Sequence, residues 1–124
     1  MGVHLVTGGA GFIGSNIARE LLRRGESVRI LDNFSTGYRS NIADLKNDLE
    51  VVEGDIRSFH IVNEAMKGVE VVYHQGALPS VPRSIADPLT SNEVNVTGTL
   101  NVLFAALEQG VRRLTFASSS SIYG

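Results

Sequence analysis

The sequence contains no cysteine, which excludes disulfide bonds and thiolate metal ligands, and we expect no metal site. It has no apolar run near the roughly 20 residues of a membrane-spanning helix. Its start lacks the basic segment and long apolar stretch of a signal peptide. The formal net charge is only -2, which favours neither nucleic acid nor an anionic membrane as a partner. These absences predict a soluble cytoplasmic protein.

The chain of 124 residues has an ordinary globular composition, with 43% hydrophobic and 19% charged residues. This length predicts a single domain, residues 1–124, that can bury about two-thirds of its unfolded surface.

Short apolar runs alternate with segments of helical periodicity along the chain. The predicted strands are residues 3–7, 27–32, 49–54, 69–74 and 112–117. The predicted helices are residues 13–24, 59–67 and 89–109, with a helical turn near 41–45. Glycine follows each of the three helices, as is typical of a helix C-terminus. The alternation predicts an α/β fold with a parallel sheet and right-handed crossovers.

A glycine-rich turn, Gly8 to Gly14, follows the first predicted strand and opens the first helix. Its three spaced glycines, Gly8, Gly11 and Gly14, would permit a sharp turn, a close approach to a pyrophosphate and tight helix–sheet packing. The helix N-terminus adds free N–H groups and a positive dipole end. The glycines alone leave a plain strand–helix turn open, but this context favours a dinucleotide site.

Acidic residues end the next two predicted strands. Asp32 lies about 20 residues beyond the glycine turn, where a carboxylate accepts hydrogen bonds from the ribose hydroxyls and repels a 2′-phosphate. This predicts NAD rather than NADP, although Arg39 keeps NADP open and Asp32 could be a solvated strand end. Asp55 could receive the adenine amino group or, equally, cap the helix at 59–67.

The glycine turn and residues 31–37, 53–57 and 95–99 resemble the extended short-chain dehydrogenase/reductase family, and within it the NAD-dependent epimerase/dehydratase group. Residues 74–84 are similar to UDP-sugar 4-epimerases, especially those acting on UDP-N-acetylhexosamines. The resemblance covers the whole chain. It implies a Rossmann-type parallel sheet of strand order 3-2-1-4-5, with helices on both faces, truncated after the fifth strand.

The resemblance also implies binding residues for NAD and for a nucleotide-sugar substrate. Those for NAD are Gly8, Gly11, Phe12, Ile13 and Gly14 at the pyrophosphate, Asp32, Asn33, Ser35, Thr36 and Gly37 at the adenosine ribose, Asp55 and Ile56 at adenine, and Gln75, Gly76, Ala77 and Asn95 elsewhere along the cofactor. Those for the hexose are Ser80, Val81, Arg83 and Ser84. Pro79 replaces a lysine that some epimerases carry near the nicotinamide-side ribose, so that contact is not expected.

The serine run 118–121 precedes a Tyr-Gly pair, and alignment on that pair gives Ser119 the place of the family's catalytic hydroxyl. Such a hydroxyl would bind the sugar oxygen that becomes a ketone and relay its proton to a tyrosine. Dehydratases of the group carry Asp and Glu where this chain has Ser120 and Ser121, which disfavours dehydration. Without the resemblance, the run would be interpreted as a polar strand exit.

The implied reaction is 4-epimerisation of a UDP-hexose, in which NAD⁺ takes a hydride from C4 and returns it to the other face of a keto intermediate. The family needs a tyrosine followed four residues later by a lysine. The tyrosines and lysines of this chain form no such pair; they are Tyr38, Tyr73, Tyr123, Lys46 and Lys67. We therefore expect the NAD-binding part of an epimerase that is inactive alone.

Three further expectations concern partners and alternatives. The end of the chain within a motif suggests a truncation, which would expose a sheet edge and favour self-association. The apolar residues Leu100, Leu103, Phe104 and Leu107 belong to the core or to a homodimer interface. The competing interpretations are a non-catalytic module that binds NAD or another nucleotide, and a fragment without ligand affinity. A nucleotide-sugar dehydratase or reductase is a less favoured alternative.

Overall fold

The computed structural model describes residues 2–9, 11–33, 41–45, 48–75 and 93–116. Within them lies a five-stranded parallel sheet of order β3-β2-β1-β4-β5, which confirms the predicted topology. The strands are β1 (Val3–Thr7), β2 (Ser27–Asp32), β3 (Glu50–Glu53), β4 (Val69–His74) and β5 (Arg113–Phe116). The helices are α1 (Phe12–Arg23), the 3₁₀ turn η2 (Ala43–Leu45), α2 (Phe59–Ala65), the π-helical segment η3 (Glu93–Gly98) and α5 (Thr99–Gln109).

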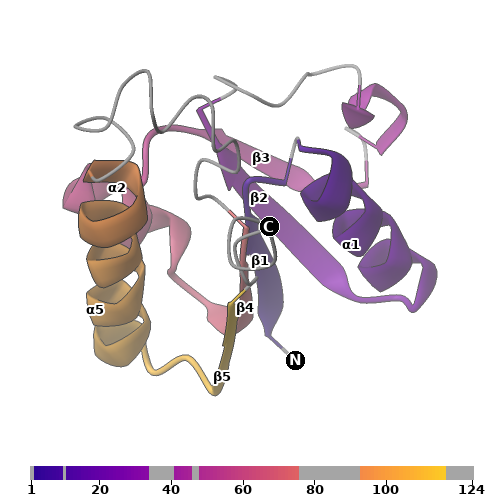
Figure 1. The fold of residues 1–124 in the computed structure, drawn as a ribbon. Helices are drawn as coiled ribbons and strands as arrows, with labels where there is room; N and C mark the ends of the chain where they lie inside the picture. Colours follow the sequence, from indigo (N-terminus) through magenta and orange to yellow (C-terminus); the bar gives the residue numbers. More distant parts are fainter. Residues whose placement is uncertain (1, 10, 34–40, 46–47, 76–92, 117–124) are drawn as a thin grey trace, which may run out of the picture.

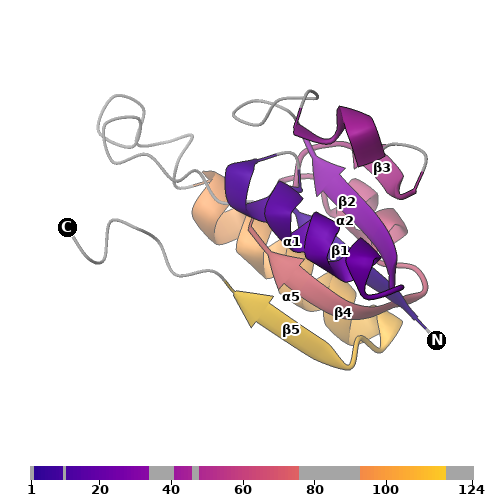
Figure 2. The same ribbon diagram turned by 90° about the vertical axis from the view of Figure 1, so that its right-hand side faces the viewer.

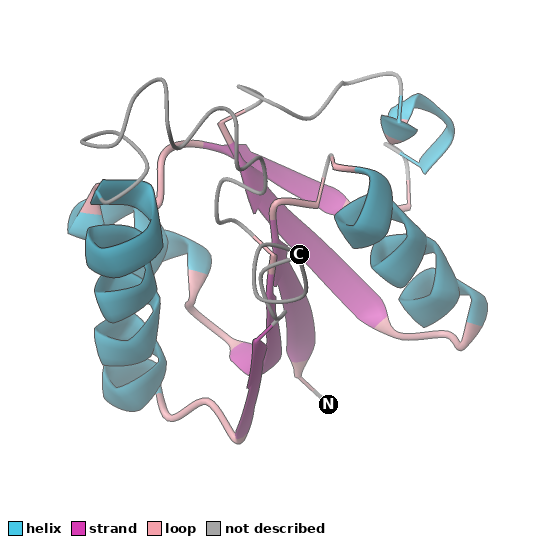
Figure 3. Ribbon diagram, viewed as in Figure 1, coloured by secondary structure: helices cyan, strands magenta, loops and turns pink. Residues whose placement is uncertain are grey.

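Helices cover both faces of the sheet. Helix α1 and the turn η2 lie on one side, and α2 and α5 lie together on the other (Figures 1 and 3). In the view turned by 90°, β5 is the outer strand beside β4 (Figure 2). Among the described residues, no helix combines the length and apolar character needed to cross a bilayer.

The central strands bury side chains on both faces, because successive residues of a strand point to opposite sides of the sheet. Leu5 and Leu31 belong to the core cluster that packs under α2 and α5. Their neighbours Val6 and Ile30 belong to the cluster under α1. All four side chains are fully buried, so two apolar layers sandwich the sheet.

Strand register brings the predicted site residues to one edge. Thr7 pairs with Leu31 of β2 on one side and with His74 of β4 on the other, and Asp32 pairs with Glu53 of β3. The carboxyl ends of four strands are therefore aligned. The chain order reverses on either side of β1, and ligands of open α/β sheets bind at such a switch point.

Three predicted elements differ most clearly from the structure. The strand predicted at 49–54 is shorter, at Glu50–Glu53. The strand predicted at 112–117 begins one residue later, at Arg113, and residue 117 lies outside the described part of the chain. The predicted helix 89–109 is not one α-helix over its described part, because six residues form a π-helix before α5 begins. This segment, EVNVTG, is rich in β-branched residues and ends in glycine, which are weak α-helix formers. Helix α5 ends as predicted at Gly110, whose φ is 71°.

Candidate dinucleotide-binding site

The turn between β1 and α1 is fixed by backbone hydrogen bonds. Gly8 has a φ of 71°, a left-handed conformation that glycine adopts without strain. Its N–H donates to the carbonyl of Leu31 at 2.7 Å, and its own carbonyl accepts the N–H of Gly11 at 3.0 Å. The chain thus reverses direction at the end of β1 while staying attached to β2.

Gly14 lets the first turn of α1 lie directly on this turn. A Cβ atom at Gly14 would overlap the carbonyl of Gly8 and would lie 3.0 Å from the Cα of Gly9. Gly9, which sequence reasoning did not single out, is itself packed against Ile30, and a Cβ there would lie 2.5 Å from Ile30 Cβ. Because glycine carries no side chain, positions 9 and 14 permit this close packing.

Among the described residues, no side chain caps the N-terminus of α1. Gly11 is the N-cap residue and supplies no side-chain cap, and the first turn contains no acidic residue. The early N–H groups of a helix have no partner within the helix and carry its positive dipole end, so they favour a phosphate. Phe12 and Ile13 lie in the same turn and are 80% and 61% exposed.

Acidic and amide side chains line the neighbouring strand ends. Asp32 ends β2 and is buried, and its carbonyl accepts the N–H of Gly54 at 3.0 Å. The next residue, Asn33, hydrogen-bonds the carboxylate of Asp55 just beyond β3. The Asn33 amide thus contacts the Asp55 carboxylate, and Asp32 directly precedes Asn33 at the end of β2. Polar side chains of this kind suit a ribose and an adenine.

The carboxylate of Asp55 is held ionised by Arg57. The Arg57 guanidinium donates from Nη2 to Oδ2 at 2.6 Å and from Nε to Oδ1 at 3.1 Å, and the Arg57 N–H donates to Oδ1 at 2.9 Å. These bonds, together with Asn33, hold the pKa of Asp55 below its usual range. The structure decides against the helix-cap alternative, because Ser58 is the N-cap residue of α2.

Ile56, between Asp55 and Arg57, is attached to helix α5. Its side chain is buried, and its carbonyl accepts a hydrogen bond from Asn101 Nδ2 on α5 at 2.9 Å. Sequence reasoning missed Asn101 and Arg57. A polar residue on the buried side of an apolar helix was the available signal for Asn101.

A buried polar chain joins β1, β4 and α5 at the same edge. The Gln75 N–H donates to Thr7 Oγ1 at 2.9 Å, and His74 Nε2 lies 3.1 Å from Thr99 Oγ1. The ring of Phe116 meets the His74 ring edge-on at 5.7 Å. Burial lowers the pKa of His74 to about 4, so the imidazole is neutral at pH 7. Sequence reasoning also missed this chain.

The structure brings together the predicted cofactor residues of the first four strand ends. They are Gly8, Gly11, Phe12, Ile13, Gly14, Asp32, Asn33, Asp55, Ile56 and Gln75. The backbone of Asn95 lies in η3. The other predicted residues lie outside the described part of the chain; they are Ser35, Thr36, Gly37, Gly76, Ala77, Ser80, Val81, Arg83, Ser84 and Ser119.

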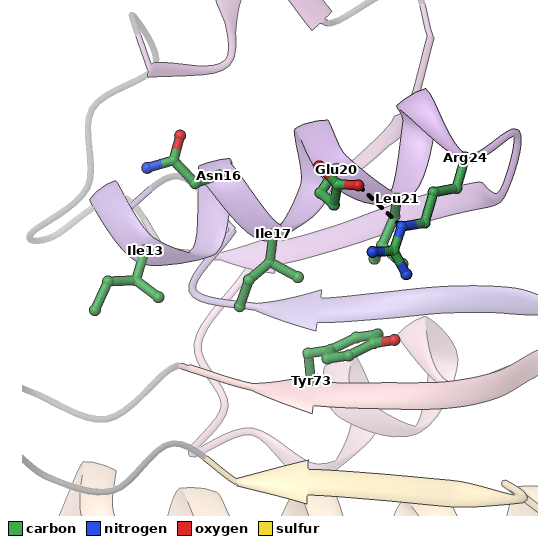
Figure 4. A pocket seen from close by; sticks show the side chains of 7 residues that line it. All are labelled: Ile13, Asn16, Ile17, Glu20, Leu21, Arg24 and Tyr73. Carbon is green, nitrogen blue, oxygen red and sulfur yellow. Dashed lines mark hydrogen bonds and ion pairs between the residues drawn. The ribbon is translucent and has the colours of Figure 1, made fainter.

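A groove of about 400 Å³ runs along α1 above β4 (Figure 4). Its lining residues are Ile13, Asn16, Ile17, Glu20, Leu21, Arg24 and Tyr73. Ile13 is the only lining residue of this groove that is also a predicted cofactor residue. The Tyr73 ring lies under α1. The described residues contain no group of three or more His, Asp or Glu side chains placed to hold a metal ion.

Comparison with solved structures shows the same architecture in proteins named as nucleotide-sugar enzymes. A UDP-glucose 4-epimerase from Thermus thermophilus in complex with NAD is 43% identical, with a TM-score of 0.86 over 94% of this chain and 37% of that one. A dTDP-glucose 4,6-dehydratase from Streptomyces venezuelae with bound NAD is 38% identical, with a TM-score of 0.85 over 90% of this chain and 38% of that one.

Comparison with curated proteins gives the same relationship. A UDP-glucose 4-epimerase from Klebsiella pneumoniae is 38% identical over 126 residues, which cover 97% of this chain and 91% of that protein. The chain spans only 36–39% of the length of five other curated relatives. The model of the NAD dependent epimerase/dehydratase family matches residues 4–124. Since this match takes in the glycine turn and nearly the whole sheet, the chain belongs to the NAD-dependent epimerase/dehydratase family.

Proposed function

We propose that this chain is the NAD-binding domain of a UDP-hexose 4-epimerase. The observation that carries the proposal is the uncapped N-terminus of α1, which directly follows the Gly8 turn and lies beside the buried Asp32. A helix end of this kind suits a pyrophosphate, and a strand-end carboxylate suits an unphosphorylated ribose.

The residues of the site fit a dinucleotide. Gly14 allows the first turn of α1 to lie against the Gly8 turn, and the backbone N–H groups at the start of α1 would hold the pyrophosphate. Asp32 would bind the adenosine ribose and repel the 2′-phosphate of NADP. Asp55, ionised and held by Arg57, would accept the adenine amino group. Bound NAD⁺ would supply the hydride acceptor of the reaction.

The epimerase assignment is supported by the names of the relatives and by the serine run. Several curated relatives are UDP-glucose 4-epimerases. Ser119 would be the hydroxyl that contacts the sugar, and Ser120 and Ser121 lack the acidity that elimination of water requires. The 124 residues contain no tyrosine followed four residues later by a lysine. We therefore expect no epimerase activity from this polypeptide alone. The cytoplasmic location stays a prediction.

A homodimer is part of the proposal. Helix α5 and the segment before it expose Val96, Leu100, Phe104 and Leu107, each at least 49% accessible, whereas Val102, Ala105 and Ala106 of α5 are buried in the core. Leu103 is half-buried. A stripe of large exposed apolar side chains marks an interaction surface, and we expect two copies of the chain to associate through it.

Calorimetric titration with NAD and NADP tests the cofactor site. We expect NAD to bind and NADP to bind at least about 10-fold more weakly, since a 2′-phosphate would lie against the Asp32 carboxylate. Asp32→Asn removes the negative charge and should therefore reduce the difference between the affinities for NAD and NADP. A chain that binds neither dinucleotide would contradict the proposal, and so would an unchanged preference in the variant. Interconversion of UDP-glucose and UDP-galactose by the pure chain would contradict its predicted inactivity.

A further inference from the structure

The short turn that carries Asp55 is attached to α5, a helix on the face of the sheet opposite α1 (Figure 1). We propose that Asn101 is a positioning residue for adenine recognition, acting through Ile56 on the carboxylate of Asp55. The inference rests on the proposed NAD site, because it assigns the control of base recognition in that site to a residue outside it.

Helix α5 and the glycine before it hold Ile56 at two points. Asn101 Nδ2 donates to the Ile56 carbonyl at 2.9 Å across 45 residues of sequence. One turn earlier, Gly98 approaches the Ile56 side chain so closely that a Cβ there would lie 2.5 Å from Ile56 Cγ1. The hydrogen bond fixes the backbone of Ile56, and the close packing fixes its side chain.

Two of the bonds made by Asp55 lie within the turn itself. Arg57 binds the Asp55 carboxylate from two residues away, and Ser58 N–H donates to the Asp55 carbonyl at 3.0 Å. Both contacts move with the turn, since all the partners belong to it. Two bonds tie the turn to other elements: Asn33 holds the carboxylate at the end of β2, and Asn101 holds the Ile56 carbonyl at α5. The Asn101 bond therefore helps to set how the carboxylate is placed relative to the base.

Loss of the hydrogen bond from Asn101 would leave the Ile56 carbonyl without its amide donor. We expect the turn to move until this carbonyl accepts a hydrogen bond from another donor. A hydrogen bond between a carboxylate and an amino group depends steeply on distance and angle. Recognition of the adenine amino group should therefore weaken more than the rest of NAD binding, which uses the glycine turn and Asp32.

The test compares NAD with nicotinamide hypoxanthine dinucleotide, in which an oxo group replaces the adenine amino group. A carboxylate that accepts from the amino group should favour NAD by about 10-fold in the unaltered chain. We expect Asn101→Ala to reduce that ratio to about 2-fold or less, because the misplaced carboxylate no longer distinguishes the bases. Calorimetric titration measures both affinities, and the ratio is insensitive to a general loss of stability.

Gln109→Ala is the matched control. Gln109 lies on the same helix and donates from Nε2 to Asn63 Oδ1 on α2 at 3.2 Å. The variant therefore loses a similar amide hydrogen bond between α5 and its surroundings, but not one to Ile56. It should keep the NAD preference of the unaltered chain. If Asn101→Ala does not fold, Asn101→Leu keeps the branched shape, removes the donor and favours the helix more strongly than asparagine does.

Each outcome decides a separate point. A reduced ratio in the Asn101 variant with an unchanged ratio in Gln109→Ala supports the inference. An unchanged ratio in a folded Asn101 variant overturns it and leaves the NAD site intact, as does an equal reduction in both variants. An unaltered chain that binds the two dinucleotides equally, or binds neither, overturns the proposed role of Asp55 and the inference with it.

Discussion

The Thr7 hydroxyl oxygen and His74 Nδ1 lie 2.7 Å apart, although 67 residues separate them in the sequence. The hydroxyl already accepts the N–H of Gln75, so its proton is available for Nδ1. The imidazole proton is then on Nε2, where it can be donated to Thr99. This one arrangement satisfies every partner and joins two strand ends to the start of α5.

Removal of the hydroxyl should destabilise the fold. Thr7→Val keeps the shape of the side chain, but it leaves His74 Nδ1 buried without a partner. We expect a loss of about 1–3 kcal/mol in the free energy of unfolding, measured by urea denaturation. Thr115→Val on β5 is the control, since its side chain is exposed and should change stability by less than about 0.5 kcal/mol. Equal effects of the two substitutions would contradict the role of Thr7.

Stability should fall as pH drops from 6.5 toward 4. Burial lowers the pKa of His74 to about 4, so the unfolded chain binds a proton in this range while the folded chain does not. The contribution of the neutral imidazole is fully present above pH 6.5 and is lost at lower pH. Between pH 7 and pH 5 we expect the free energy of unfolding to decrease by about 2 kcal/mol from this residue.

Urea unfolding at both pH values measures this dependence. His74→Gln should reduce the decrease in the free energy of unfolding between pH 7 and pH 5. His60→Gln, at an exposed position on α2, should leave this decrease unchanged. The pKa values of Glu20, Asp44, Asp55 and Glu70 are lowered by their hydrogen bonds and cationic neighbours, so these carboxylates lose their contribution at more acidic pH. If the free energy of unfolding of His74→Gln still decreases between pH 7 and pH 5 as it does in the unaltered chain, another group causes the pH dependence.

Gly14→Ala should impair NAD binding more than it impairs folding. The added methyl group would overlap the Gly8 carbonyl, so the first turn of α1 must move away from the glycine turn that it covers. We expect the dissociation constant for NAD to rise by at least about 10-fold. Ala18→Gly, at a buried site one turn along the same helix, is the control: it should lower the melting temperature with little change in affinity. Unchanged NAD affinity in Gly14→Ala would contradict the proposed pyrophosphate site.

Charges on the exposed face of α5 should prevent self-association. Phe104 and Leu107 are 58% and 79% exposed, and replacement of both by glutamate would place negative charge in an apolar contact. Light scattering after size-exclusion chromatography should show a dimer for the unaltered chain and a monomer for the double variant. Phe59→Glu on α2, at a side chain that is 38% exposed, should remain dimeric. A monomer in all three samples would contradict the proposed homodimer.

Much of this protein could be predicted from its sequence, because strands, helix starts and turns leave local signals. The alternation of apolar runs with helical periods predicted the parallel sheet, and Gly8, Gly11 and Gly14 marked the turn because each stands where a side chain would be unfavourable. Asp32 was identifiable from its place at a strand end. The roles of Ser35, Ser119 and the other predicted residues outside the described part stay predictions.

The tertiary structure decided what depends on residues distant in the chain. Sequence spacing left Asp55 as either a helix cap or a base contact, and only the packed structure shows its carboxylate held by Arg57 and Asn33 while Ser58 takes the cap position. The hydrogen-bond partners of His74 and Asn101 likewise became known only from the tertiary structure. A local pattern reports the conformation and burial of neighbouring residues, whereas a hydrogen bond across 45 or 67 residues exists only after the sheet and its helices have packed.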